Sequence, residues 1–377
     1  MKRLGVGVCI AMLAGCATSP PDPASPTAEV RYRLHNRLEQ TRQDVVELSV
    51  PASLRNDRLS AIDESSGESL PLQYPAASDQ VDRALVQVRL PANARRSIVL
   101  RATGTPVATP TIAYGRHVPE RKDDFAWEND RIAFRVYGPA LAATGEISSG
   151  IDVWAKRVRV PVIDRWYAAD DYHADHGEGL DFYKVGPSRG CGGIALRDGD
   201  AFAASGNYVR WRRLAAGPLR VTFELDYAAW GPAGAQVVET KRISLDAGSN
   251  FSRIESRLTP QSAQTTLPLS IGVQRAAVDS AARDPKGRWI DVWSAPQGEN
   301  GSIGCAVVLP ARTSAAISDR SGHLWLDTKQ SAAEPLIYYA GAAWSKGQDF
   351  PSASEWNAEV SAFARRVTAP IQVDDKR

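Results

Sequence analysis

The chain has 377 residues, of which 43% are hydrophobic and 23% are charged. Such a composition is typical of a globular protein with one large or two medium-sized domains. The formal net charge is only +2 at neutral pH and no Lys- or Arg-rich tail occurs, so no nucleic-acid partner is predicted. Beyond the first twenty residues, no apolar stretch approaches the length of a transmembrane helix.

The first residues resemble a lipoprotein signal peptide, expected at 1–15. Lys2 and Arg3 precede an apolar stretch, and the LAGC sequence that ends at Cys16 matches a lipobox. Cleavage before Cys16 would leave its thiol for lipidation; the alternative is an ordinary secretory signal with a chance cysteine. Acyl chains would anchor the protein stably, and Ala17 after the cysteine favours the outer membrane. We therefore expect a periplasm-facing lipoprotein that contacts the membrane through its lipid only.

Two β-rich units are expected after a Pro-, Ser- and Ala-rich tether at residues 16–28. Residues 29–105 contain four segments in which apolar and polar residues alternate, which predicts a small β-sandwich. Prolines then mark a boundary, and residues 106–377 form the second unit.

Alternation continues through most of the second unit. A turn at residues 246–250 predicts a hairpin, and no helix is expected between 111 and 350. One amphipathic helix is predicted at residues 354–367, with Ser352 or Ser354 as its N-cap. Many strands and one late helix indicate a large antiparallel β-sandwich.

The stretch from Asp164 to Gly193 differs from the rest of the unit. It holds six acidic residues, two histidines, three tyrosines and six glycines within thirty positions. Charges at this density are too costly to bury without partners, so the stretch is interpreted as a long functional loop on a rigid scaffold. Cys191 within it and Cys305 could form a disulfide in an oxidising compartment, or remain two buried thiols.

The common catalytic signatures are absent. No phosphate-binding Walker loop, no HExxH zinc motif, no G-x-S-x-G elbow and no dinucleotide fingerprint occurs. Acid–base chemistry is favoured instead, because His titrates near neutral pH and Tyr or Lys can act when its pKa falls. The candidate catalytic residues are Tyr172, His173, His176, Tyr183 and Lys184.

Substrate-binding residues are expected beside these. Arginine can hold a carboxylate bidentately, tryptophan can stack on a sugar face, and carboxylates can bond hydroxyl groups. The candidates are Arg165, Arg189, Trp127, Trp166, Trp344, Asp171 and Glu178. The alternative for the charged residues is that they form a solvated loop, and the alternative for the tryptophans is that they pack in the core. No metal or other cofactor is predicted; calcium, held by the acidic residues, is the alternative.

Four segments together resemble the bacterial family known as domain of unknown function 4861. They are PERKDDFAWENDRIAFRVYGPAL, GIDVWAKRV followed by RWY, DDYHADHGEGLDFYKVGPSRGCGG and YYAGAAWSKGQDF. This family resembles the galactose-mutarotase-like super-β-sandwich proteins and tends to occur in systems that degrade pectin and other uronate polysaccharides. The resemblance therefore implies a saccharide substrate but no particular reaction, because that fold hosts epimerases, lyase domains and non-catalytic modules.

We thus expect an all-β protein in which a small β-sandwich precedes a large antiparallel, galactose-mutarotase-like super-β-sandwich. The leading hypothesis is an enzyme that abstracts the proton alpha to a uronate carboxylate and so catalyses β-elimination or epimerisation. One alternative is a glycoside hydrolase with paired carboxylates, for example Asp171 or Glu178. The other is a non-catalytic sugar-binding lipoprotein at the outer membrane.

Overall fold

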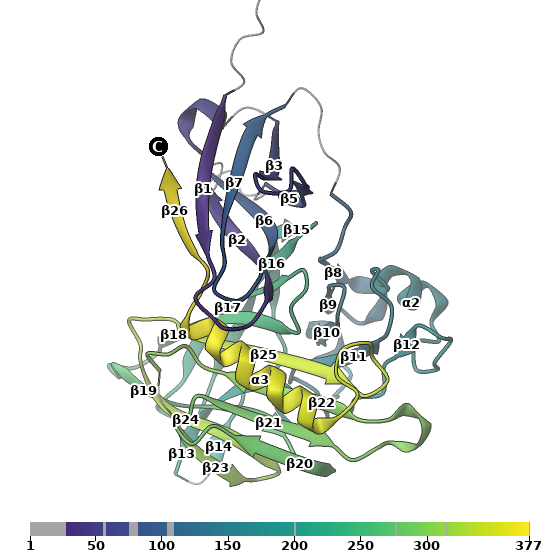
Figure 1. Ribbon diagram of the computed structural model, residues 1–377. Coiled ribbons are helices and arrows are strands. Elements are labelled where there is room, and N and C mark those ends of the chain that lie inside the picture. The colour runs from purple at the N-terminus through teal and green to yellow at the C-terminus, as the bar shows by residue number, and fades with distance from the viewer. Residues whose placement is uncertain are drawn as a thin grey trace, which may run out of the picture.

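The computed structural model describes residues 28–376 except 56–57, 75–81, 104–108, 200, 276 and 314. Figure 1 shows a small β-sandwich above a larger one, with a single long helix across the latter. The predicted signal peptide, Cys16 and all but the last residue of the tether lie outside the described residues. Within the described part of the chain, no helix is both long and apolar enough to cross a membrane.

The small sandwich pairs a five-stranded sheet, β26-β1-β7-β3-β4, with a three-stranded sheet, β2-β6-β5. Their bounds are β1 (Glu29–His35), β2 (Arg42–Ser49), β3 (Leu59–Asp63), β4 (Ser69–Leu70), β5 (Leu72–Gln73), β6 (Arg83–Leu90), β7 (Arg95–Ala102) and β26 (Gln372–Lys376). The alternating pattern predicts the inward residues correctly, since Tyr32 and Leu34 of β1 are fully buried in the core between the sheets. The four strands expected from alternation are β1, β2, β6 and β7.

The last strand belongs to this small sandwich. β26 pairs antiparallel with β1, so that Arg31 lies opposite Lys376 and Arg33 opposite Asp374. We expected these residues in the large unit, and that assignment is wrong for β26. The physical reason is that Ile371 and Val373 pack against the core of the small sandwich.

The named strands of the large sandwich all pair antiparallel in the described part of the chain, as predicted, and one isolated parallel bridge joins Ile151 to Gly190. An eight-stranded sheet, in the order β15-β16-β17-β18-β25-β22-β21-β20, faces two five-stranded sheets, β12-β11-β10-β9-β8 and β14-β13-β19-β24-β23. The eight strands are β15 (Arg210–Ala216), β16 (Arg220–Trp230), β17 (Val237–Asp246), β18 (Phe251–Pro260), β20 (Val278–Arg283), β21 (Trp289–Ser294), β22 (Ile303–Val308) and β25 (Leu336–Trp344). One continuous apolar cluster joins this sheet to both five-stranded sheets, so the large unit has a single core.

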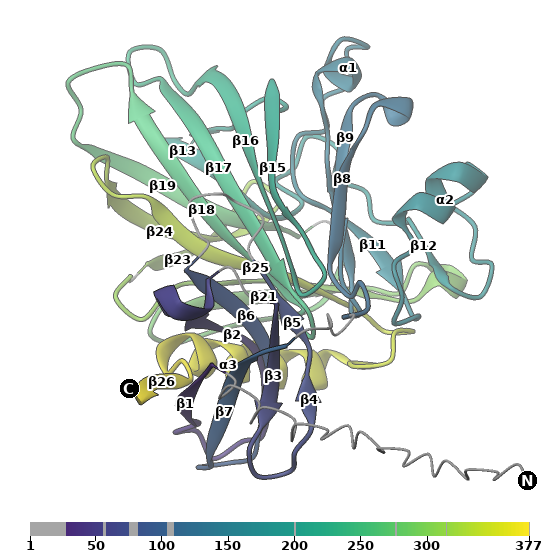
Figure 2. The same ribbon diagram turned by 90° about the horizontal axis from the view of Figure 1, so that it is seen from above.

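Helix α2 (Ile163–Ala169) covers the outer face of the first of the two five-stranded sheets. The first contains β8 (Tyr114–Val118), β9 (Asp124–Glu128), β10 (Ala133–Val136), β11 (Asp152–Lys156) and β12 (Gly179–Leu180). The second contains β13 (Cys191–Asp198), β14 (Ala201–Ala203), β19 (Thr266–Gln274), β23 (Ala316–Arg320) and β24 (His323–Ser331). Figure 2 shows helix α2 against the first sheet, on the side away from β15 and β16.

The predicted C-terminal helix is confirmed as α3 (Ala353–Thr368). The Ser352 side chain accepts a hydrogen bond from the backbone N–H of Glu355, which is N-cap geometry. Trp356 and Val360 are fully buried against β21 and β22. The expected hairpin is also confirmed, since β17 ends at Asp246 and β18 begins at Phe251.

The expectation of no helix between residues 111 and 350 is wrong. A single turn, α1 (Pro139–Ala142), and the longer α2 both lie there, with short 3₁₀ turns at Pro119–Arg121 and Gly298–Asn300. A third 3₁₀ turn, Ala52–Leu54, lies in the small sandwich. The N-terminus of α2 is capped from outside the helix, because Glu128 of β9 accepts hydrogen bonds from the backbone N–H groups of Val162 and Ile163. The buried Lys156 ammonium holds the same carboxylate at 2.6 Å.

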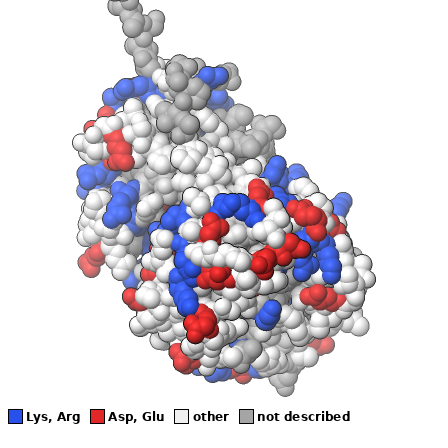
Figure 3. Space-filling view, turned by 90° about the vertical axis from the view of Figure 1, so that its right-hand side faces the viewer, with Lys and Arg blue, Asp and Glu red and all other residues white. Residues whose placement is uncertain are grey.

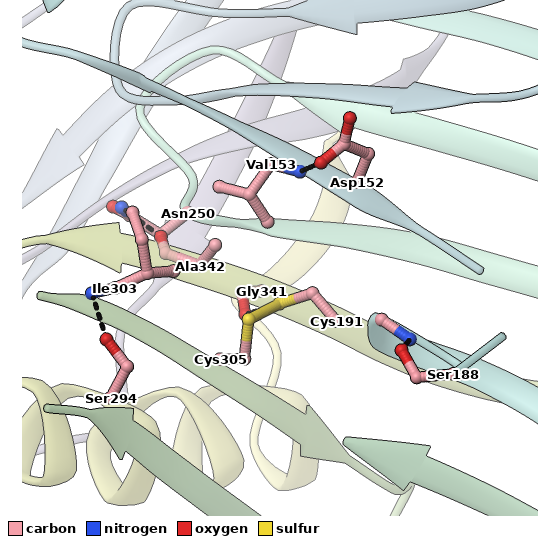
Figure 4. The surroundings of a disulfide bond; sticks show 11 residues. Asp152, Val153, Ser188, Cys191, Asn250, Ser294, Ile303, Cys305, Gly341 and Ala342 are labelled. Atoms are coloured by element: carbon pink, nitrogen blue, oxygen red, sulfur yellow. Dashed lines mark hydrogen bonds between the residues drawn. A yellow bond between two sulfur atoms is a disulfide. The ribbon is translucent and has the colours of Figure 1, made fainter. Parts of the chain in front are cut away.

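Cys191 and Cys305 form a disulfide, which decides between the two alternatives left open by the sequence. The bond joins β13 of one five-stranded sheet to β22 of the eight-stranded sheet, and Gly341 of β25 lies beside it (Figure 4). Both cysteines are buried in the core.

Candidate functional site

The sheet β8–β12 is buried on both of its faces. Phe125, Trp127 and Phe134 point into the core of the large sandwich. The alternate residues point outward, where α2 and the segment after it cover them with Trp166, Tyr167 and Tyr172. Figure 3 shows Lys and Arg side chains interspersed with Asp and Glu side chains over this side of the molecule.

Beneath α2 lies a group of buried polar side chains that we call the carboxylate–arginine cluster. Its members are Asp124, Arg135, Tyr137, Asp152 and Asp181. Arg135 donates through Nε to Asp152 at 2.9 Å and through Nη2 to Asp181 at 2.8 Å, and its Nη1 lies 3.6 Å from Asp124. The Tyr137 hydroxyl donates to the same Asp152 oxygen at 2.9 Å. One guanidinium is thus shared by three carboxyl groups.

This arrangement raises the pKa of two of the acids. Burial raises the pKa of Asp181 to about 7, with the neighbouring Asp152 acting in the same direction and Arg135 against it. Burial likewise raises the pKa of Asp124 to about 6, against the pull of Arg135. Keeping three buried carboxylates ionised around one cation costs free energy. The Asp181 carboxyl therefore gains or loses its proton near neutral pH.

His173 connects this cluster to the surface. Its Nδ1 lies 2.9 Å from the backbone carbonyl oxygen of Asp181 and 3.6 Å from the carboxyl of Asp181, while 55% of its side chain is exposed. A carbonyl oxygen can only accept, so Nδ1 carries the hydrogen and, in the neutral ring, Nε2 carries the lone pair. No described residue bonds Nε2, which leaves it open to take a proton from a ligand.

Six of the predicted site residues line one pocket of about 240 Å³ beside α2. They are Arg165, Trp166, Asp171, Tyr172, His176 and Glu178. The walls are mainly apolar, and the charged groups on its rim are paired with each other. Glu178 accepts from Arg165 at 2.8 Å and from the Trp166 indole at 3.1 Å, and His176 lies 2.9 Å from Asp171.

Tyr183 and Lys184 line a different pocket of about 280 Å³, together with Gln274, Ser294 and Cys305. The Tyr183 hydroxyl is buried without a hydrogen-bond partner among the described residues, and burial raises its pKa. The two residues thus lie apart from the α2 pocket, although the sequence places them in the same stretch.

Three predicted binding residues lie inside the large sandwich. Trp127 is completely buried and donates to Ser252, and Trp344 is buried and donates to the carbonyl of Asn300. Arg189 is only 3% exposed and donates to Ser149, and burial lowers its pKa to about 10.

The stretch 164–193 is therefore only partly the exposed loop that we expected. It begins within α2, and from Ser188 to Gly193 every residue is buried. The glycines permit this, since a Cβ at Gly190 would meet the carbonyl oxygen of Ile151 at 2.1 Å and its φ is +60°. The close approach ties the end of the stretch to the start of β11.

The cluster residues Arg135, Asp152 and Asp181 were not among the predicted site residues. A signal was present, because Arg135 and Asp152 are register partners on β10 and β11, and Trp154 follows on the same face. A charged pair beside a large aromatic on one strand face indicates that something covers that face. Within the residues that the structure describes, no three His, Cys, Asp or Glu side chains are grouped so as to hold a metal ion.

Fold and site together define an all-β sandwich protein with a buried acid–base cluster under a helical cover. A family model described as "Domain of unknown function (DUF4861)" matches residues 34–373, and the chain belongs to that family. "Uncharacterized protein P7" of Formosa agariphila is 34% identical over 300 residues, which is 72% of this chain and 71% of that protein.

Two solved structures share the fold. They are an alpha-mannosidase from Enterococcus faecalis V583 and a protein in the glycosyl hydrolase family 38 from Enterococcus faecalis, each with a TM-score of 0.53 and 9% identity. The matches cover 93% of this chain but only 46% and 47% of those proteins, so the chain spans about half of their length. At this identity the likeness shows the fold alone.

Proposed function

We propose that this protein is a carbohydrate-active enzyme that removes a proton from a uronic-acid sugar, with His173 as the base. The observation that carries the proposal is the pair formed by His173 and Asp181. The imidazole presents a free Nε2 outward, while a carboxyl with a pKa of about 7 lies behind it. This is the pairing that general acid–base catalysis near neutral pH requires.

Groups that suit an acidic sugar lie next to this pair. The Tyr172 ring lies 4.6 Å from the His173 ring, and Arg121 donates to the Tyr172 hydroxyl at 2.8 Å. Arg121 makes no ion pair with a described residue, whereas Arg165 is held by Glu178. We therefore assign the carboxylate-binding role to Arg121, with Trp166 and Tyr172 forming the apolar wall for the sugar ring.

In the reaction proposed, His173 takes the proton on the carbon alpha to the uronate carboxylate. In elimination, the electron pair then forms the C4–C5 double bond, the C4–O bond breaks, and the leaving oxygen receives a proton. In epimerisation, a proton returns to the opposite face of the same carbon. Either course needs the sugar carboxylate neutralised, which Arg121 provides. The proposed chemistry uses protein groups only, and inhibition by EDTA would favour the calcium alternative.

The fold likeness to two proteins with glycosidase titles favours a saccharide as the substrate class. It also raises a second candidate, glycoside hydrolysis. Asp152 and Asp181 contact the same Arg135, and burial raises the pKa of Asp181 to about 7, as is found for the general acids of hydrolases. We further propose that lipidation at Cys16 holds the enzyme on the periplasmic face of the outer membrane.

The test is incubation of the purified protein with uronate oligosaccharides. Absorbance of a new C4–C5 double bond, reducing ends and sugar configuration are followed together. We expect H173Q to lower kcat by roughly 10²–10⁴-fold. H176Q should lower it by less than about tenfold, because His176 is 68% exposed and its one polar contact among the described residues is with Asp171.

Three outcomes would count against the proposal. New reducing ends without a double bond or an epimer would favour hydrolysis. Unchanged binding of an unmodified saccharide would favour a non-catalytic sugar-binding protein. Full activity of H173Q would remove His173 from its assigned role.

A further inference from the structure

A groove of about 720 Å³ crosses the outer face of the small sandwich, on β26, β1 and β7. Its lining includes four arginines, Arg33, Arg37, Arg95 and Arg96, with His35 beside them. None of these residues belongs to the carboxylate–arginine cluster or to the α2 pocket. The groove is thus a separate feature of the surface.

The strand register explains why these side chains gather. On β1, Tyr32 and Leu34 fill the core, so Arg33 and His35 must point outward. His35 lies opposite Arg95 on β7, and Arg33 lies opposite Ser97 on the same strand. Opposite residues of neighbouring strands lie about 5 Å apart at Cβ, so Arg33, His35 and Arg95 lie close together on this face.

The positive charge of the groove is only partly balanced by nearby acids, since Asp374 of β26 lies opposite Arg33 of β1 in the strand register. No described residue forms an ion pair with any of its four arginines, Arg33, Arg37, Arg95 and Arg96. Two carboxylates line the groove, and one of them, Glu64, is already bonded to Arg31 at 2.6 Å. Other arginines of the same sandwich are neutralised, for example Arg83 by Glu47 and Arg101 by Glu29.

We propose that this groove binds an acidic polysaccharide chain. Guanidinium groups suit carboxylate and sulfate oxygens. Four of them, spread over β1, the segment after it and β7, suit a chain with repeated charges better than one small anion. The lining contains no Trp, Tyr or Phe on which nucleic-acid bases could stack. It also contains none of the exposed large apolar side chains that would enter a membrane.

The groove would hold the polymer while the site near His173 acts on it, but binding does not depend on the proposed reaction. The experiment therefore uses the full chain carrying H173Q, so that turnover cannot change the ligand. Polygalacturonate is titrated by calorimetry at several salt concentrations. We expect R37Q/R95Q to raise Kd by about tenfold or more and to reduce the salt dependence of binding.

The matched control is R83Q/R101Q, which removes the same total charge from two arginines that are already ion-paired. It should bind polygalacturonate as the parent does. Thermal unfolding of both variants checks the fold. R95E, a single substitution at an exposed position, tests the binding of polygalacturonate a second time. In the His173-containing protein, R37Q/R95Q should leave activity on short saccharides unchanged.

An equal loss of affinity for polygalacturonate in the control variant and in the groove variant would overturn the proposal. Binding of a neutral polysaccharide as tightly as polygalacturonate would also overturn it. Binding to vesicles of phosphatidylcholine and phosphatidylglycerol, with none to polygalacturonate, would assign the groove to the membrane instead. Failure of the activity assay alone would leave this binding result intact, so the two proposals can fail separately.

Discussion

The Asp181 carboxyl has a pKa that is raised toward neutral pH. Its pKa rises from 3.8 to about 7, first because it is buried and second because Asp152 lies beside it. The folded protein therefore holds this proton over a pH range in which the unfolded chain has lost it. The stabilisation is complete below about pH 4 and disappears as the pH rises through 7.

We predict that D181N, which mimics the protonated acid, will flatten part of this pH dependence. The free energy of unfolding of the parent should fall relative to that of D181N between pH 4 and pH 7, by at most about 1.4 kcal/mol per pH unit. Urea unfolding at four pH values measures the difference. D171N, at an exposed position, should follow the parent throughout. A difference that grows in favour of the parent as the pH rises would contradict the assignment.

At the scale of elements, α2 depends on a buried ion pair in the sheet beneath it. Glu128 accepts from Val162 and Ile163 at the start of the helix and is itself held by Lys156. Burial raises the pKa of Glu128 and lowers that of Lys156, so each charge needs the other. This pair fixes the helix that covers the carboxylate–arginine cluster.

We predict that E128A will lower the free energy of unfolding by roughly 3–5 kcal/mol, because it leaves the Lys156 ammonium buried without a carboxylate. The double variant E128Q/K156M should cost less than the sum of its single changes. D319A, which removes an exposed ion pair with Arg275, should cost less than about 1 kcal/mol. Chemical denaturation checks all three, and a small effect of E128A would show that α2 is held by its apolar contacts alone.

The same helix shows why the sequence predicts the strands better than the site. Strand alternation is local, so β1, β2, β6 and β7 and the β17–β18 hairpin can be recognised from neighbouring residues. The capping residue of α2 is Glu128, more than thirty positions before the helix, and Val162 at the N-cap position has no side-chain acceptor. No pattern among neighbouring residues predicts a cap that comes from so far away in the sequence.

The carboxylate–arginine cluster was missed for a related reason. An alternating strand normally turns its polar residues to solvent, so Arg135 and Asp152 read as surface positions. Their burial is decided by α2, which packs over the outer face of the sheet. The stretch from Asp164 onward was recognised as functional by composition, but its side chains divide among two pockets and the core.

At the scale of the whole molecule, the disulfide connects two sheets of the large sandwich across 114 residues of sequence. Cross-links over long loops restrict the unfolded chain strongly. We predict that C191A/C305A will lower the free energy of unfolding by roughly 2–5 kcal/mol. Denaturation in the absence of reductant measures this loss. The parent treated with reductant should approach the variant, and equal stability of the two proteins without reductant would contradict the prediction.

The pairing of β26 with β1 has a consequence for how the protein is made. Arg31 leaves the ribosome long before its partner Lys376, because the whole large sandwich lies between them in the sequence. The large sandwich can form in between, so the small sandwich, although first in the sequence, is completed last. Gln372 and Asp374 line the basic groove, and this surface is therefore complete only after β26 has been synthesised and has paired with β1.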